Sequence, residues 1–162
     1  MLKKVSFLVL ALCLLMGAQV FMGCDANSGD DDSQSISLPA ALKGKWVSGG
    51  TEVTITSDTF TDSYNGSVSY AGVIVNVISD GDDAGYIIIQ YTSNSSFSDA
   101  AGRYYAVHYK NLTASTMEYS GAYSGADPDN GGGNGKLTQE EAEETYTVLN
   151  GYFDYYSTCT KQ

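Results

Sequence analysis

The sequence has few of the residues on which most catalytic, metal and disulfide sites depend. Its 162 residues include one histidine, one tryptophan and three cysteines. A single histidine does not provide an ordinary zinc or copper site, which draws on several His or Cys ligands. It also restricts any Ser-His-Asp triad to His108, which shares a predicted strand face with Lys110 on the expected solvent side and has no nucleophile-elbow motif. We therefore expect no enzyme activity.

Basic residues are also scarce. Eight lysines and arginines stand against 19 aspartates and glutamates, which gives a formal net charge of −11. An acidic surface repels phosphate backbones and anionic lipid headgroups, and the sequence has neither a basic patch nor a glycine-rich phosphate loop after a predicted strand. The composition thus argues against nucleic acid as a partner.

The longest apolar run lies at the amino terminus. Two lysines precede the almost wholly apolar stretch Val5 to Val20, which leads to Gly23 and Cys24. A basic start, an apolar run and a small residue before the cut are typical of a secretory signal. We therefore predict a signal peptide over residues 1–23. The alternative is an uncleaved anchor, because about 18 apolar residues can span a bilayer.

The residues around the cut resemble the bacterial lipobox, in which Gly or Ala precedes a cysteine that is acylated and becomes the first residue of the mature protein. Gly23 and Cys24 match this motif, whereas Phe21 and Met22 depart from its usual residues. The resemblance implies a lipoprotein of the bacterial cell envelope, anchored to a membrane by lipid on Cys24 and facing the periplasm or the exterior. Residues 24–37 have little to bury and predict an acidic flexible linker.

The cysteine count allows no disulfide framework within the predicted domain. Cleavage of the signal and acylation of Cys24 leave Cys159 as the one free thiol. A lone cysteine near the end of a strand is expected to be a small buried hydrophobe, with a reactive thiol as the alternative.

From residue 38 onward, apolar and polar residues alternate with a period of two between short turns, of which Asn65-Gly66 is the strongest hairpin signal. Strands are expected near residues 44–48, 53–56, 60–64, 68–78, 86–91, 104–110, 116–123 and 152–160. Consecutive hairpins favour a barrel over the alternative sandwich, because closure removes exposed strand edges. We predict an all-β domain over residues 38–162, an antiparallel up-and-down barrel of about eight strands.

One short helix is expected before the last strand. Thr138 and Glu141 have the spacing of a capping box, in which the threonine caps the first turn and the glutamate reaches back. The apolar residues that follow on one helix face are Ala142, Tyr146 and Leu149. Asn150-Gly151 is expected to end the helix. The narrow apolar face predicts that the helix lies across one end or flank of the barrel.

The start of the domain resembles the lipocalin (calycin) barrels. A predicted helical turn at Pro39 to Leu42 is followed by Gly44-Lys45-Trp46, which is similar to the Gly-x-Trp signature of that family. The resemblance implies that Trp46 plugs the closed end of a lipocalin-like barrel and packs on a basic side chain, for which Lys161 and Arg103 are the candidates. The family's Thr-Asp-Tyr-type turn late in the barrel is missing, so an ordinary core position for Trp46 is the alternative.

Tyrosine is the most unusual component, with 13 residues. Five are expected to face the barrel interior: Tyr105, Tyr109, Tyr119, Tyr123 and Tyr155. A cavity lined by phenols is apolar in body and polar in spots, which predicts binding of a small hydrophobic or aromatic ligand. The alternative is an interior filled by these side chains. A filled barrel would serve as a protein-interaction module (inhibitor, adhesin or assembly factor), contacting an envelope protein through loop 93–101 or 124–136.

The segment 127–141 resembles the calcium loop of an EF-hand. With Asn130 at position one, Asn134 falls at position five and Glu141 at position twelve. Position three is Gly132, which has no side chain to contribute. Calcium is therefore an alternative to a plain glycine-rich surface loop, and no other cofactor is predicted.

Overall fold

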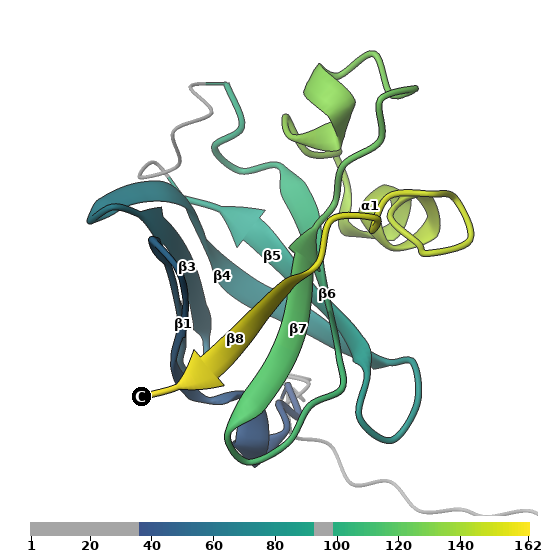
Figure 1. Ribbon diagram of the computed structural model, residues 1–162. Helices are drawn as coiled ribbons and strands as arrows, with labels where there is room; N and C mark the ends of the chain where they lie inside the picture. Colours follow the sequence, from purple (N-terminus) through teal and green to yellow (C-terminus); the bar gives the residue numbers. More distant parts are fainter. Residues whose placement is uncertain (1–35, 93–98) are drawn as a thin grey trace, which may run out of the picture. The chain divides into compact units, whose positions relative to one another are not determined.

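Eight β-strands, each hydrogen-bonded to the next in chain order, close into a barrel in the computed structural model, which describes residues 36–92 and 99–162 (Figure 1). The strands are β1 (Gly44–Ser48), β2 (Thr51–Ile55), β3 (Thr59–Tyr64), β4 (Ser67–Ser79), β5 (Gly85–Tyr91), β6 (Tyr104–Lys110), β7 (Thr116–Gly121) and β8 (Ser157–Lys161). All neighbours are antiparallel, and β1 closes the barrel on β8 by pairing Trp46 with Lys161. This confirms the predicted up-and-down barrel, is consistent with a lipocalin-like architecture, and rules out the sandwich.

The strand connections follow the local sequence. At the β3–β4 hairpin Asn65 and Gly66 have φ angles of 48° and 80°, the left-handed values of a type I′ turn. The pairing register shifts between Asp62 and Ser63 and again between Ile74 and Asn76. Such bulges bend a strand and increase its twist, which lets the long strand β4 curve from β3 to β5 around the closing sheet.

The helix before the last strand is shorter than predicted. The α-helix α1 spans Gln139–Thr145 and packs on the barrel flank against β5 and β6. The predicted capping box forms in part: Thr138 Oγ1 accepts from the Glu141 N–H at 3.1 Å, while the Glu141 carboxylate accepts from the Leu137 N–H. The Asn150 side-chain amide donates to the carbonyls of the last helical turn.

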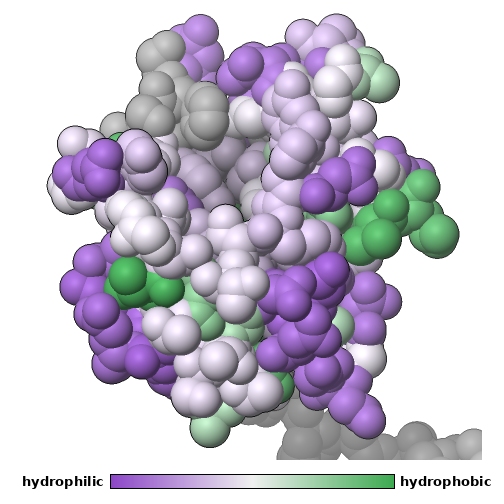
Figure 2. Space-filling model, viewed as in Figure 1, coloured by the Kyte–Doolittle hydropathy of each residue, from purple (hydrophilic) through white to green (hydrophobic). Residues whose placement is uncertain are grey.

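Placing Leu149 on the buried face of this helix was wrong. Because α1 ends at Thr145, Leu149 lies in the following turn and is 97% exposed, whereas Ala142 and Tyr146 are buried as predicted. Figure 2 shows hydrophobic side chains gathered at the edge of the molecule beside α1, on an otherwise mostly polar face. Val148 and Leu149 are the exposed apolar residues of this turn.

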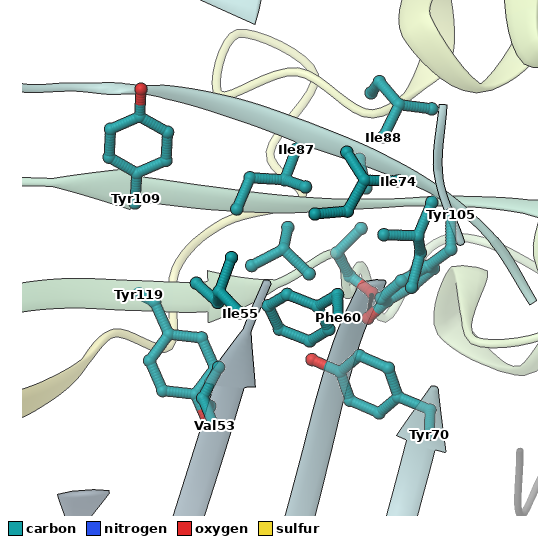
Figure 3. Packing of buried hydrophobic residues seen from close by; sticks show 14 of the residues in the cluster. Val53, Ile55, Phe60, Tyr70, Ile74, Ile87, Ile88, Tyr105, Tyr109 and Tyr119 are labelled. Atoms are coloured by element: carbon teal, nitrogen blue, oxygen red, sulfur yellow. Dashed lines mark hydrogen bonds between the residues drawn. The ribbon is translucent and has the colours of Figure 1, made fainter. Parts of the chain in front are cut away.

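The barrel interior is lined mainly by aliphatic and aromatic side chains from the inward positions of the strands (Figure 3). Val53, Ile55, Phe60, Ile74 and Ile87 are each 2% exposed or less. Burial of one such side chain contributes about 1.5–3 kcal/mol relative to exposure. This alternating inward set is the physical reason why the period-two pattern is visible in the sequence.

The outward faces of β5 and β6 are buried as well, where α1 and the chain after it cover them. Ile88 and Ala106 are fully buried on this face. His108 was predicted to face solvent. It does point outward from the barrel, but it is only 3% exposed because Phe153 and Tyr156 pack over it.

A short 3-10 helix, η1 (Ala40–Leu42), lies at one end of the barrel (Figure 1). Trp46 is fully buried beside it. Its Nε1 donates to the Leu42 carbonyl at 2.8 Å. Of the two candidate basic partners, Lys161 is the one in contact: its Nζ lies 5.0 Å from the Trp46 ring centroid and donates to the Ala41 carbonyl. Gly44 has a φ of 133°, a conformation that residues with a side chain rarely adopt, which explains the glycine there.

No helix in the described ranges is long and apolar enough to cross a membrane. The predicted signal peptide (1–23), Cys24 and all but the last two residues of the predicted linker (24–37) lie outside the described residues. So do residues 93–98 of the predicted interaction loop 93–101.

Candidate functional site

One carboxylate and several phenols line the barrel interior towards the end opposite η1. Asp62 of β3, Tyr70 of β4, Tyr105 of β6 and Tyr119 of β7 all occupy inward positions and are 6–9% exposed. The Tyr119 hydroxyl donates to Asp62 Oδ2 at 2.7 Å across the barrel. Tyr70 and Tyr105 pack edge to face, with centroids 5.5 Å apart. We call these four residues the Asp62 cluster.

The carboxylate of this cluster is buried among neutral groups. Burial raises the pKa of Asp62, and hydrogen bonds from Tyr119 and Ser69 oppose this without cancelling it. The ion pairs found among the described residues involve other carboxylates: Glu52, Asp80, Glu118, Asp127 and Asp129. Burial also raises the pKa values of Tyr70, Tyr105 and Tyr119. The negative charge of Asp62 is the second-largest cause of each increase. These phenols therefore stay protonated, and two of them donate hydrogen bonds: Tyr119 to Asp62 and Tyr105 to the Ala122 carbonyl.

Replacing Asp62 with asparagine is expected to raise the melting temperature at pH 7 by a few degrees and to change it little near pH 3, since 1 kcal/mol corresponds to about 4 °C in such a domain. The folded pKa of Asp62 is raised, so its contribution to stability is full below the unfolded pKa and is lost as the pH rises through the folded pKa. Asparagine does not titrate and still offers Tyr119 an acceptor. Melting curves from pH 3 to 8 measure this, and parallel pH dependences in the two proteins would contradict it.

Three buried tyrosines, Tyr91, Tyr105 and Tyr146, also hold the loop that follows β7. The rings of Tyr91 and Tyr105 stack with centroids 5.2 Å apart, and Tyr146 meets Tyr105 edge to face at 5.6 Å. Their hydroxyls donate to backbone carbonyls of that loop: Tyr91 to Gly133, Tyr105 to Ala122 and Tyr146 to Gly132. These contacts account for part of the unusual tyrosine content, because each phenol fills the core and also satisfies a loop carbonyl.

Two of the five tyrosines predicted to line the interior lie outside it. Tyr123 is 48% exposed and Tyr155 is 70% exposed, and their rings contact each other at 5.7 Å. β7 ends at Gly121 and β8 begins at Ser157, so both residues lie beyond the strands whose alternation supported the prediction. Tyr105, Tyr109 and Tyr119 are buried as expected. Figure 3 shows the hydroxyl of Tyr109 directed away from Tyr70 and Tyr119.

Asp62 and Tyr70 were missed as site residues, although the sequence contains a signal for each. Asp62 follows Phe60 by two residues and therefore takes an inward position on β3. Tyr70 precedes Ile74 by four residues on β4 and faces the same way. A charged residue at an inward position of a predicted strand was the available indication.

A second polar region is the loop between β7 and α1. Asp127 Oδ2 accepts from Lys136 Nζ at 3.0 Å and from the Tyr152 hydroxyl at 2.6 Å, and Oδ1 accepts from the Asp129 N–H. Burial opposes ionisation of Asp127, but these hydrogen bonds outweigh it and lower its pKa. A cavity of about 320 Å³ lies here, lined by Ser124, Ala126, Asp127, Pro128, Asp129, Lys136, Asn150 and Tyr152.

The same loop does not have the arrangement of an EF-hand. Asn130 begins the 3-10 helix η2 (Asn130–Gly132) with a φ of 56°, and the Glu141 carboxylate accepts from a backbone N–H at the start of α1. The Lys136 ammonium lies 3.0 Å from Asp127 Oδ2 and neutralises this carboxylate. Within residues 36–92 and 99–162, no group of three or more His, Cys, Asp or Glu side chains is placed to hold a metal ion. Asn130, Asn134 and Glu141 therefore match the calcium ligands of an EF-hand in their sequence spacing only.

A carboxylate–imidazole–phenol chain lies on the covered outer face of β6. His108 Nε2 is 3.2 Å from Asp80 Oδ2, and His108 Nδ1 is 2.8 Å from the Tyr156 hydroxyl. A carboxylate only accepts, so neutral His108 donates from Nε2 and accepts from Tyr156 at Nδ1. Burial raises the pKa of Tyr156 to about 12, so this phenol is not an activated nucleophile. These hydrogen bonds attach the segment before β8 to the barrel.

Replacing His108 with glutamine is expected to flatten the loss of stability between about pH 7 and pH 5. Burial lowers the folded pKa of His108, despite the opposing effect of Asp80; Lys110 lowers it further. Its contribution is therefore present above the unfolded pKa and is lost as the pH falls through the folded pKa. The difference between wild-type and variant melting temperatures, followed against pH, measures this effect. A pH-independent difference would show that His108 does not titrate in this way.

Cys159 is fully buried on an inward position of β8, where burial raises the pKa of its thiol to about 11. This confirms the prediction of a small buried hydrophobe rather than a reactive thiol. Comparison of the chain with protein-family models, with curated proteins and with solved structures finds no match.

Proposed function

We propose that the protein is a lipid-anchored lipoprotein of the bacterial cell envelope whose barrel binds a small aromatic ligand at the Asp62 cluster. The envelope location is supported by the apolar run that ends in Gly23-Cys24. Ligand binding is supported by one observation above all: a buried carboxylate and three phenols, from four strands, meet inside the barrel. A barrel selected for stability alone gains nothing from a buried carboxylate, which loses hydration.

The cluster has the composition of a small-molecule site. Tyr70 and Tyr105, which also stack on Phe60 and Tyr91, supply aromatic walls. Asp62 supplies a carboxylate that accepts hydrogen bonds from Tyr119 and Ser69. Pockets of this kind bury most of a ligand against apolar walls and orient it with a few polar groups. Trp46 and η1 cover the other end of the barrel, so a ligand is expected to enter opposite them.

Native mass spectrometry of full-length protein extracted from membranes in mild detergent tests this function. We expect a retained small molecule of defined mass, which organic solvent removes and which the Tyr70→Ala variant retains poorly. Val73→Ala, at an outward position of the same strand, is the matched control and should retain it. If the extracted wild-type protein carries no such molecule and binds no added aromatic compound, the proposed function is wrong.

The alternative function, a protein-interaction module, is favoured by a different observation. The loop after β7 is held by three tyrosine hydroxyls and carries the polar cavity around Asp127. A photoreactive amino acid at position 129, which is exposed, should then crosslink in cells to one envelope protein, whereas the same group at position 73 should not. Equal crosslinking from both positions would contradict a specific interface at this loop.

A further inference from the structure

We infer that the ligand of the barrel carries a protonated amine, which forms an ion pair with Asp62. This inference rests on the proposed function and specifies the chemical class of the ligand. Asp62 is 7% exposed and its partners are hydroxyl groups, those of Tyr119 and Ser69. Hydroxyls stabilise a carboxylate by hydrogen bonding but do not neutralise it.

Two lysines that are partly or largely buried, Lys161 and Lys136, have partners other than Asp62. Lys161, which also enters the barrel from β8, donates to the Ala41 carbonyl and lies against Trp46, at the end covered by η1. Lys136 is paired with Asp127 in the loop after β7. Asp127, a largely buried carboxylate with a structural role, differs from Asp62 in this respect. A lysine ammonium lies 3.0 Å from Asp127 and neutralises it. Asp62 has no such ion pair among the described residues, which leaves its charge available to a cationic ligand.

The surrounding rings favour the same ligand chemistry. Asp62 interacts electrostatically with the hydroxyls of Tyr70, Tyr105 and Tyr119, which places all three phenols near the carboxylate. Figure 3 shows the Tyr70 hydroxyl directed into the interior on the side of Tyr119. Electron-rich ring faces attract an ammonium group, and the attraction is greater where water is excluded. A buried carboxylate surrounded by phenols thus favours cations over neutral molecules and disfavours anions.

The experiment compares three probes with the same phenyl ring and different charge: 2-phenylethylamine, 2-phenylethanol and phenylacetate. Titration calorimetry on full-length protein in neutral detergent at pH 7 should give the amine an affinity at least about tenfold above the alcohol, with no measurable binding of the acid. In Asp62→Asn the preference for the amine should vanish. Asp129→Asn, which removes the same charge from an exposed position, should keep it.

The outcomes distinguish the claim that the barrel binds an aromatic ligand from the claim that this ligand is an amine. Equal binding of amine and alcohol, or an amine preference that survives in Asp62→Asn, would overturn the amine inference and leave the aromatic-ligand function standing. Failure of all three probes to bind the wild-type protein would count against both. The melting curves described for Asp62→Asn verify that this variant is folded, so loss of binding cannot be attributed to unfolding.

The pH dependence of amine binding provides a second readout. Protonation of Asp62 removes the negative charge, so affinity for 2-phenylethylamine should fall as the pH drops through the pKa of Asp62, while affinity for 2-phenylethanol should not. The other titratable groups facing the carboxylate are the phenols of the cluster and the Cys159 thiol, and burial raises the pKa values of all of them. They stay neutral while Asp62 titrates, so amine binding that does not weaken when the pH is lowered from 7 to below the pKa of Asp62 would contradict the ion pair.

Discussion

Trp46→Ala is expected to lower the free energy of unfolding by about 3–5 kcal/mol, the range for truncation of a fully buried tryptophan. The indole is completely buried, it donates to the Leu42 carbonyl, and its ring contacts the Lys161 ammonium. Its removal leaves a cavity between η1 and the barrel and breaks the attachment of η1. Chemical denaturation followed by tyrosine fluorescence or circular dichroism measures the change.

Two further variants separate the contributions of the Trp46 hydrogen bond and of the Lys161 ammonium to the stability of this end of the barrel. Trp46→Phe keeps most of the buried ring but loses the Nε1 hydrogen bond, and about 1 kcal/mol of this variant's loss is attributed to that bond. Lys161→Met keeps the aliphatic stem and removes the ammonium, with an expected loss of about 1–2 kcal/mol from the cation–π contact and the bond to Ala41. If Trp46→Ala costs no more than Lys161→Met, the tryptophan does not act as the main plug of the barrel.

Cys24→Ser is expected to abolish fatty-acid labelling of the protein completely. Labelling with a clickable palmitate analogue, followed by intact mass measurement, gives the result directly. Stable anchoring by lipid needs two membrane signals, which a multiply acylated terminal cysteine supplies and a serine does not. Cys159→Ser is the matched control, because Cys159 is fully buried in β8 and should contribute no label.

The mass of the mature wild-type protein discriminates between the two interpretations of the amino terminus. A protein that begins at Cys24 and carries added acyl mass fits the lipoprotein. A protein that retains residues 1–23 without added mass fits the uncleaved anchor. Label that persists in Cys24→Ser would show that another residue is acylated and would contradict the lipobox assignment.

The local elements of this protein could be predicted from its sequence, because alternation and turn residues act over a few positions. Asn65-Gly66 forms the expected hairpin turn, and Thr138 begins the helix as expected. The period-two pattern identified each strand to within a few residues except the last, which starts at Ser157 rather than Tyr152. The resemblance of Gly44-Lys45-Trp46 to a family signature led to the contact of Trp46 with a basic side chain, but left Lys161 and Arg103 as alternatives.

The wrong predictions of burial and exposure share one cause. His108, Tyr123, Tyr155 and Leu149 all lie where burial depends on what covers a strand or where an element ends, and neither is encoded within a short window. The segment that buries His108 follows it by about 45 residues, at Phe153 and Tyr156. Periodicity specifies which residues share a face of a strand but not whether a distant segment packs on that face.

The sequence by itself determined that this chain has an acidic, tyrosine-rich, all-β domain of consecutive hairpins behind an apolar amino terminus that ends in a lipobox-like motif. Only the tertiary structure brought Asp62 from β3 against Tyr119 from β7, 57 positions apart in the sequence. Barrel closure is the physical reason: pairing β1 with β8 turns every inward side chain towards a common axis, so strands that are not neighbours meet across the interior. The carboxylate at the centre of the proposed site therefore becomes evident only once the sheet is closed.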